Sequence, residues 1–170
     1  MHRLLLLLTV LSFNTFAANP PAESFDRMNA EFPDLVFYDP AGKAAKLSDY
    51  RGKAVLVKLW ATWCGVCRAK WPDHQALYDS VKSDSAIEVI TISIFEDQQV
   101  SQDWVTRQGF EVPLFKNPIT DRGAVPVVDG SYLFVKGTPM TFLIDRDGVL
   151  RKKVVGSAAP ISAADIRDLI

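Results

Sequence analysis

Cysteine is scarce in this chain, which has only two among its 170 residues. That number is too small for a fold held together by several disulfide bonds, as small secreted scaffolds are. Histidine is equally rare, with two in the whole sequence. A structural zinc site needs four ligands. The two cysteines and His74, the one histidine beyond residue 17, provide only three.

An excess of charge of either sign is also missing. The chain has 19 basic and 20 acidic side chains, for a net charge of −1. Binding to a phosphate backbone requires a surplus of Lys and Arg, so the composition excludes nucleic acid as a partner. We find no internal repeat or low-complexity tract. With 48% hydrophobic and 23% charged residues, the sequence is typical of one globular domain with a sizeable core.

The first 17 residues have the order of a secretory signal peptide. A basic start, Met1 to Arg3, precedes an apolar run over residues 4–16 and small residues at Ala17 and Ala18. Cleavage is expected after Ala17, with Ala18 as the second choice, and an exported, for example periplasmic, location follows. The alternative is an uncleaved membrane anchor, but the run is shorter than the ~20 apolar residues of a spanning helix. No cysteine stands near the cut for lipid attachment.

The rest of the chain is divided by its composition into a flexible lead-in over residues 18–31, rich in proline at its start, and one domain over residues 32–170. Apolar and β-branched runs predict strands, and helical spacing predicts helices. The strands are expected at 34–38, 54–60, 87–95, 140–144 and 149–155. The helices are expected at 64–82, kinked by Pro72, at 98–108, and from 162 onward. Between residues 113 and 130, where Pro and Gly recur, we expect loops and one short helix. The order predicts an α/β fold with a central mixed sheet sandwiched by helices.

Both cysteines lie between a buried strand and the helix that follows it. Cys64 and Cys67 are two residues apart, a spacing that closes a small disulfide ring able to open and close by thiolate exchange. Unpaired N–H groups at the helix start stabilise a thiolate on Cys64. Arg68 and Lys70 add positive charge nearby. Cys64 is therefore the expected nucleophile, and Cys67, one turn further along, the thiol that resolves the mixed disulfide.

Three other roles are open to the cysteine pair. A structural disulfide with so small a loop contributes little stability. Zinc lacks ligands, as described above. A Cu(I) site is chemically sensible, with Cys64, Cys67 and either His74 or Met140 as ligands, because thiolate and thioether sulfur favour Cu(I). A copper-carrying metallochaperone therefore stays as the alternative function.

Three stretches resemble the thioredoxin superfamily, and its exported TlpA/ResA-like branch in particular. They are LSDYRGK at 47–53, VKLWATWCGVC at 57–67 and GTPMTFLID at 137–145. The resemblance covers roughly residues 32–170. The strand predicted at 54–60, which contains Lys58, also resembles a strand in the thioredoxin-like domain of secreted methionine sulfoxide reductase fusions.

The resemblance implies a thioredoxin-like fold and an exported thiol–disulfide oxidoreductase that reduces protein disulfides. It assigns Pro139 as a cis proline facing the cysteines, and the backbone of Thr138 as the partner of an extended substrate segment. Trp63 is expected to contact the substrate at the surface, and Trp60 to pack in the core. No cofactor or metal is needed, since electrons pass through the cysteine pair. A membrane protein that delivers electrons is the implied second partner. The identity of the substrate protein, and the direction of electron flow, stay open.

The chain departs from the family at two positions. Relatives carry an acid or Asn on the strand under the cysteines and often Glu six residues after the first cysteine, where this chain has Lys58 and Lys70. A desolvated Lys58 would have a lowered pKa, and its neutral amine could act as the base for Cys67. Two alternatives remain: an ion pair of Lys58 with Glu96 or Asp97, or a stem that reaches solvent. His74 is expected at the surface.

Overall fold

The computed structural model describes residues 27–120 and 123–170. The signal peptide predicted at 1–17 and most of the predicted lead-in lie outside the described residues. None of the helices in the described ranges is long and apolar enough to cross a membrane.

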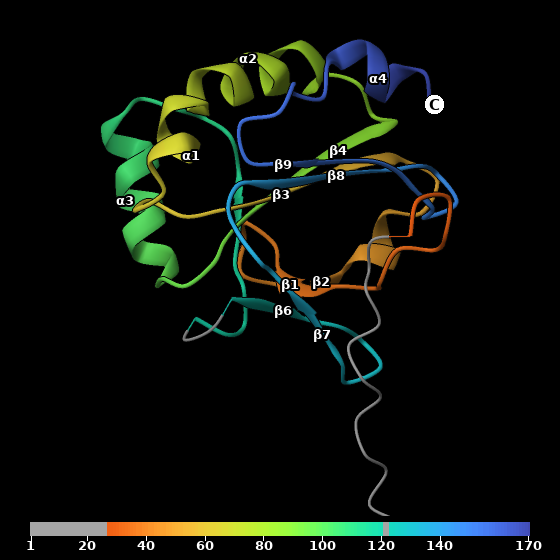
Figure 1. The fold of residues 1–170 in the computed structure, drawn as a ribbon, viewed down its shortest axis with the longest axis horizontal. Helices are drawn as coiled ribbons and strands as arrows, with labels where there is room; N and C mark the ends of the chain where they lie inside the picture. Colours follow the sequence, from red (N-terminus) through yellow and green to blue (C-terminus); the bar gives the residue numbers. More distant parts are fainter. Residues whose placement is uncertain (1–26, 121–122) are drawn as a thin grey trace, which may run out of the picture.

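A five-stranded mixed sheet forms the centre of the domain, in the strand order β5-β4-β3-β8-β9 (Figure 1). Strand β3 pairs in parallel with β4 and antiparallel with β8, while β4 pairs in parallel with β5 and β8 antiparallel with β9. The elements in chain order are β1 (Val36–Tyr38), β2 (Ala44–Lys46), the 3-10 helix η1 (Leu47–Tyr50), β3 (Ala54–Trp60), α1 (Gly65–Ala69), α2 (Trp71–Val81), β4 (Ile87–Ser93), α3 (Gln98–Arg107), β5 (Leu114–Phe115), β6 (Ala124–Pro126), β7 (Tyr132–Phe134), β8 (Met140–Ile144), β9 (Leu150–Val155) and α4 (Ala163–Arg167). The predicted α/β fold with a mixed central sheet is confirmed.

Strand β3 is buried along its whole length because both faces of the sheet are covered. Alternate side chains point to opposite faces. Val55, Val57 and Leu59 enter an apolar cluster with residues of β1, β6 and β7. Leu56 packs in a second cluster with residues of α2 and α4, and Trp60 in a third that includes the cysteines. Helices α2 and α4 therefore cover one face, and the two small sheets β1–β2 and β6–β7 lie over the other (Figure 1).

Two predicted elements differ in the structure. The helix expected over 64–82 is divided into α1 and α2 at Lys70, which ends the first and begins the second. Pro72 lies in the first turn of α2, where its missing N–H costs no helical hydrogen bond. It therefore starts a helix rather than kinking one. The short helix expected between 113 and 130 is wrong, because that region contains β5 and β6.

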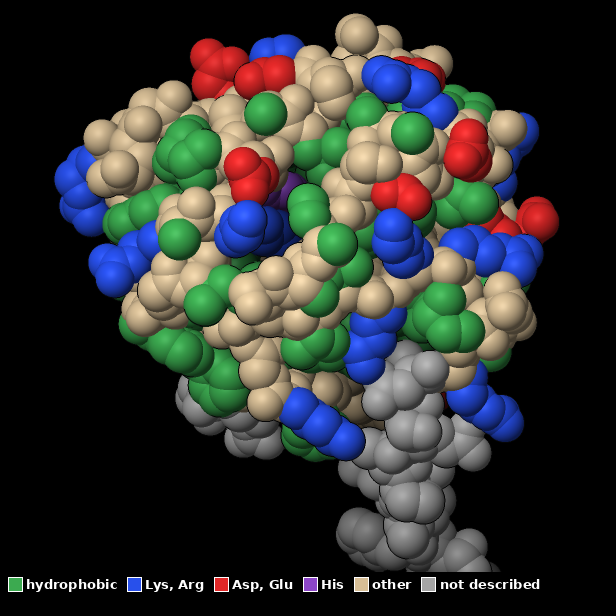
Figure 2. Space-filling view, turned by 45° about the horizontal axis from the view of Figure 1, so that its top comes forward, with side chains coloured by type: hydrophobic (Ala, Val, Ile, Leu, Met, Phe, Trp, Pro, Cys, Tyr) green, Lys and Arg blue, Asp and Glu red, His purple; other side chains and the backbone are tan. Residues whose placement is uncertain are grey.

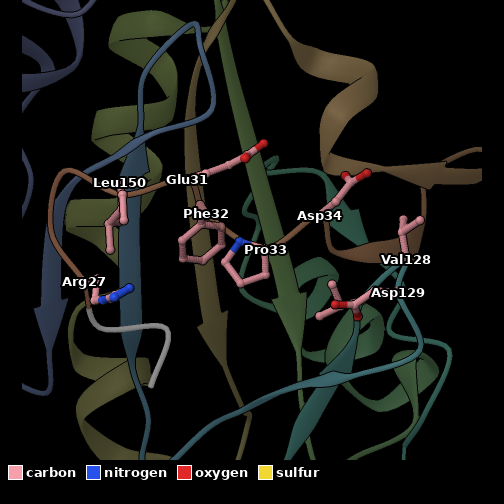
Figure 3. A pocket seen from close by; sticks show the side chains of 10 residues that line it. Arg27, Glu31, Phe32, Pro33, Asp34, Val128, Asp129 and Leu150 are labelled. Carbon is pink, nitrogen blue, oxygen red and sulfur yellow. The ribbon is translucent and has the colours of Figure 1, made fainter. Parts of the chain in front are cut away.

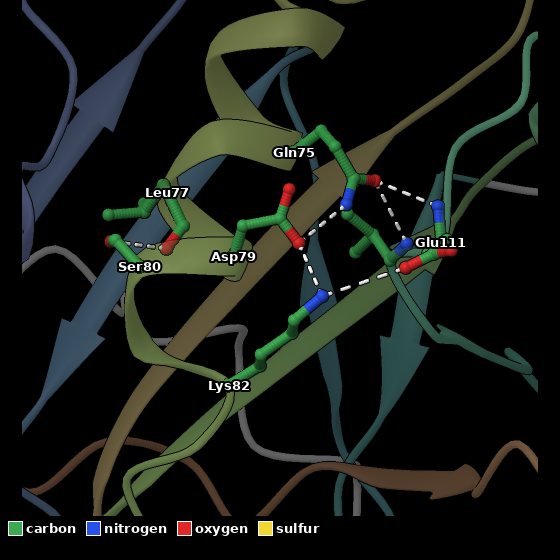
Figure 4. A network of polar contacts seen from close by, with 7 residues as sticks. Gln75, Leu77, Asp79, Ser80, Lys82 and Glu111 are labelled. Carbon is green, nitrogen blue, oxygen red and sulfur yellow. Dashed lines mark hydrogen bonds and ion pairs between the residues drawn. The ribbon is translucent and has the colours of Figure 1, made fainter.

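A polar network holds α2 against the segment that leads into β5 (Figure 4). The Gln75 side-chain oxygen accepts hydrogen bonds from the backbone N–H groups of Glu111, at 2.8 Å, and Val112, at 3.2 Å. Its amide nitrogen donates to Asp79, which also pairs with Lys82 at 2.7 Å. The ion pairs are exposed and contribute little. The two hydrogen bonds that Gln75 accepts from the backbone connect α2 to the segment before β5.

Candidate active site

Cys64 and Cys67 form a disulfide at the start of α1, where β3 has ended. Cys64 is the N-cap residue of this helix, and its Sγ accepts a hydrogen bond from the Cys67 N–H at 3.1 Å. Such a donor stabilises negative charge on Cys64 sulfur. Cys64 is 7% exposed and Cys67 is fully buried, so only Cys64 is open to a partner.

The segment before β8 lies directly against the disulfide. Cys64 Sγ lies 3.6 Å from the carbonyl oxygen of Thr138, and the Thr138–Pro139 peptide bond is cis, as predicted. Strand β8 begins at Met140 and pairs with the central strand β3. Residues 74 positions apart in sequence are thus fixed beside one another by the sheet.

The loop that carries Trp63 and Cys64 is held by a carboxylate. Glu96 accepts hydrogen bonds from the Thr62 N–H, at 3.0 and 3.1 Å, and from its hydroxyl at 2.6 Å. Partial burial raises the pKa of Glu96, and the bonds from Thr62 oppose that effect. Asp97 accepts from the Gln99 N–H and caps α3. The two acids therefore have different roles, and neither forms an ion pair with Lys58.

Lys58 is buried on the face of the sheet that α2 covers. It is 6% exposed, so the alternative in which its stem reaches solvent is wrong. Its neighbours in register are Thr91 on β4 and Thr141 on β8, and its Nζ lies 5.7 Å from the centre of the Trp71 ring. Burial lowers the pKa of Lys58 from 10.5 to about 8, against a smaller opposing effect of Asp73. A neutral amine is accordingly within reach at mildly alkaline pH.

His74 lies in the same layer, and its prediction as a surface residue is wrong. It is 4% exposed, and its Nε2 lies 2.9 Å from the Thr91 hydroxyl. Burial, and then the charge of Lys58, lower the pKa of His74 well below 6.5, so the imidazole is neutral. The stripe of α2 that faces the sheet contains Trp71, His74 and Val81. The spacing of three between Trp71 and His74 is the signal that identifies His74 as buried.

A small cavity of about 60 Å³ joins this polar layer to the segment at the disulfide. Its lining includes Lys58, His74, Asp73 and Pro139. Figure 2 shows a histidine side chain in a hollow on this face, beside basic and acidic side chains. Lys70, on the rim, forms an ion pair with Asp73 at 3.2 Å. Lys58 and Pro139 therefore face a common cavity.

The sequence-predicted residues thus form two groups. Cys64, Cys67 and Thr138 lie together at the start of α1, and Trp63 beside them is 59% exposed. Lys58 and Pro139 line the same cavity. Trp60 is fully buried, as expected.

The residues considered for Cu(I) do not gather around the cysteines. Across residues 27–120 and 123–170, no group of three or more His, Cys, Asp or Glu side chains is arranged to hold a metal ion. His74 is bonded to Thr91, and Met140 packs in the apolar cluster on the other face of the sheet.

A larger cavity of about 440 Å³ lies elsewhere, between the start of the described chain and the β6–β7 turn (Figure 3). Phe32, Pro33, Val128 and Leu150 line it, with Arg27, Glu31, Asp34 and Asp129. It contains neither cysteine nor histidine, so the sulfur chemistry belongs to the site at α1.

Comparisons with known proteins agree with this geometry. The model of the AhpC/TSA family matches residues 28–153. The thiol-disulfide oxidoreductase ResA of Geobacillus thermodenitrificans (strain NG80-2) is 30% identical over 154 residues, which cover 91% of this chain and 84% of the relative. ResA of Bacillus subtilis (strain 168) is 28% identical over 167 residues, 98% of this chain and 89% of that protein. In structure, a thioredoxin-family thiol:disulfide interchange protein from Chlorobium tepidum TLS has a TM-score of 0.59 at 22% identity. That alignment covers 85% of this chain and 95% of that one, and it shows the common fold.

Proposed function

Because the chain belongs to the AhpC/TSA family and is a thiol–disulfide oxidoreductase, we propose that it reduces disulfide bonds in exported proteins. The observation that carries the proposal is the difference between the two sulfurs. Cys64 is at the N-cap of α1, beside the carbonyl of Thr138, while Cys67 is fully buried beneath it. Cys64 is the nucleophile and Cys67 the resolving thiol.

The reaction begins with the reduced pair. The Cys64 thiolate attacks one sulfur of the substrate disulfide, forms a mixed disulfide and releases the first substrate thiolate. Cys67, once deprotonated, attacks the Cys64 sulfur, and the second substrate thiolate leaves. The protein ends with the Cys64–Cys67 disulfide, two electrons having passed to the substrate. The two substrate thiolates take up protons.

Lys58 handles the proton of Cys67 in this scheme. A buried carboxylate would accept that proton and become a neutral acid, whereas the neutral amine of Lys58 accepts it and becomes a charged ammonium. The pKa of about 8 supports this role, because a fraction of the side chain is then neutral near physiological pH. The cavity that Lys58 shares with Pro139 provides room for exchange with solvent.

Thr138, Pro139 and Trp63 bind the substrate segment. The carbonyl of Thr138 lies 3.6 Å from Cys64 Sγ, and there it would pair with an extended peptide in the manner of strand addition. Trp63, with 59% of its surface exposed, offers apolar contact area next to Cys64.

Export requires a second partner. In an oxidising compartment the cysteine pair, once oxidised, does not regain electrons from the surroundings. A membrane protein that carries electrons outward from the cytosol would re-reduce it. The predicted signal peptide at residues 1–17 supports this location.

Single cysteine variants test the assignment. Cys67→Ser should accumulate a mixed disulfide with a protein substrate, because the resolving thiol is missing, whereas Cys64→Ser should not. Non-reducing electrophoresis with insulin as the substrate, followed by mass spectrometry, distinguishes the two. Trapping by Cys64→Ser instead of Cys67→Ser would reverse the roles, and trapping by neither would reject the mechanism.

A further inference from the structure

Phe95, just after β4, has a backbone conformation that bulky residues rarely adopt. Its φ is +62°, in the left-handed region that favours glycine or asparagine. Such a residue persists only where its surroundings force it, and this strain is often found at functional sites. The side chain is nevertheless 44% exposed, so core burial does not explain the conformation.

Both neighbours of Phe95 are bonded to the end of β3 or to the loop that follows it and carries the cysteines. The Ile94 N–H donates to the Trp60 carbonyl at 2.9 Å, and Glu96 accepts from Thr62. Phe95 lies between these anchors, and its ring meets the Trp63 ring edge to face, with centroids 6.0 Å apart. We call the two rings, Trp63 and Phe95, the aromatic ledge.

The outer edge of the Phe95 ring lies against Gly123. A Cβ atom at Gly123 would overlap the ring, with three ring carbons closer than 3.0 Å. Because residue 123 is glycine and has no Cβ, there is room for the Phe95 ring. Three segments distant in sequence converge to present an aromatic surface to solvent beside Cys64.

We infer that the aromatic ledge binds an apolar side chain of the protein substrate, close to the substrate cysteine that reacts with Cys64. This inference rests on the proposed reduction of protein disulfides. Trp63 is adjacent to Cys64 in the chain, so a sulfur bonded to Cys64 brings the flanking residues of its own chain over the ledge. Phe95 enlarges the apolar area beyond what Trp63 alone offers, and it thereby sets a preference for substrates with an apolar neighbour of the cysteine.

Two disulfide-linked peptides test this preference directly. They differ only at the residue next to the cysteine, which is Phe in one and Ser in the other. Wild-type protein, supplied with electrons by dithiothreitol, should reduce the Phe peptide with a KM roughly tenfold lower, the effect of burying a large part of an aromatic side chain. Phe95→Asn should remove most of that difference, and Phe95→Leu should retain much of it.

Phe95→Asn separates binding from folding, because asparagine tolerates the left-handed backbone. Its thermal unfolding midpoint should be no lower than that of the wild type. Hydroxyethyl disulfide, too small to reach the ledge, should be reduced at an unchanged rate. Val128→Asn is the matched control: Val128 is 54% exposed and lines the separate cavity, so both peptides should be unaffected.

Equal KM values for the two peptides in the wild type, or an undiminished preference in Phe95→Asn, would overturn the inference. So would an equal loss with hydroxyethyl disulfide, which would mean that Phe95 only shapes the cysteine loop. Dissociation of a dimer in Phe95→Asn, seen by analytical ultracentrifugation, would assign the ledge to self-association instead. If the wild type reduces no peptide but reduces hydroxyethyl disulfide, the proposed function itself fails, a result distinct from loss of preference.

Discussion

At the scale of single residues, the most unusual feature is a lysine buried between the central sheet and α2. Lys58 is 6% exposed, and the histidine in the same layer, His74, is neutral. Two charged groups could not share this layer at low cost, because neither is paired with a buried acid. The proton content of the layer therefore depends on Lys58.

Replacement of Lys58 by methionine should stabilise the folded protein at neutral pH. The Lys58 ammonium has a pKa of about 8 in the folded protein and of 10.5 in the unfolded chain, so burying its charge costs about 3 kcal/mol at pH 7. Between pH 8 and 10.5 the folded protein releases the proton before the unfolded chain does, so the wild type regains that free energy. Urea unfolding at pH 7 and at pH 9.5 measures the difference, which should shrink at the higher pH. Lys43→Met, at an exposed position, serves as the control. An advantage of Lys58→Met that is the same at both pH values would contradict the burial effect.

The same variant tests the proton-handling role. In the wild type, the rate of disulfide reduction should rise with pH through about 8 as Lys58 becomes neutral. Lys58→Met should be slower and should lack this inflection, as measured by stopped-flow tryptophan fluorescence. If the pH profile of the variant matches that of the wild type, Lys58 does not act on Cys67.

His74 should make the fold sensitive to acid. Burial lowers the pKa of His74, so below pH 6.5 the imidazole is protonated in the unfolded chain but stays neutral in the folded protein. Stability is therefore lost as the pH falls below 6.5. In His74→Gln, which keeps an amide to bond Thr91, urea midpoints should fall less between pH 7 and pH 5. Parallel pH profiles of the two proteins would show that His74 does not contribute.

At the scale of elements, the site depends on connections more than on the helices themselves. The β3–α1 loop is held by Glu96, which comes from the segment after β4. The long apolar strands could be predicted from the sequence, because their burial on both faces leaves a continuous run of apolar residues. Strands β5, β6 and β7 could not, because two or three residues carry no periodicity and they are held by long-range pairing. The sequence suggested Glu96 only as a partner of Lys58 and placed Phe95 in a strand. Their contacts with Thr62 and Trp63 could not be predicted, because these depend on the long-range pairing of β4 with β3.

Loss of the Glu96 carboxylate should loosen the cysteine loop. Glu96→Ala removes the acceptor for the Thr62 N–H and hydroxyl, and we expect a loss of about 1–2 kcal/mol in the free energy of unfolding. Reduction of insulin should slow as well, because Trp63 and Cys64 follow directly. Glu111→Ala is the control, because the Glu111 side chain is exposed and its ion pair with Lys82, at 3.6 Å, contributes little stability. Equal effects of the two substitutions in urea unfolding would argue against a specific role for Glu96.

At the scale of the whole molecule, the scarcity of cysteine suits a thiol–disulfide oxidoreductase. The pair is the only one in the chain, so Cys64 has no third cysteine with which to form a wrong disulfide. The resemblance drawn from three sequence stretches is confirmed at the level of family and fold. The placement of Lys58 and His74 in one layer could not be derived that way, because it depends on how α2 is rotated against the sheet.

Export with removal of the first 17 residues remains a prediction of the sequence. The small residue Ala17 follows an apolar run too short to span a bilayer, which favours cleavage over anchoring. Expression of the full chain in a Gram-negative host should therefore yield soluble periplasmic protein that begins at Ala18. Intact-mass measurement and N-terminal sequencing locate the cut, and a start at Asn19 would assign it to Ala18 instead. Leu6→Arg, which interrupts the apolar run, should keep the protein in the cytoplasm with Met1 to Ala17 still attached. An intact N-terminus in the membrane fraction of the unaltered chain would show that the segment is an anchor, and the redox domain would then work beside the membrane rather than free of it.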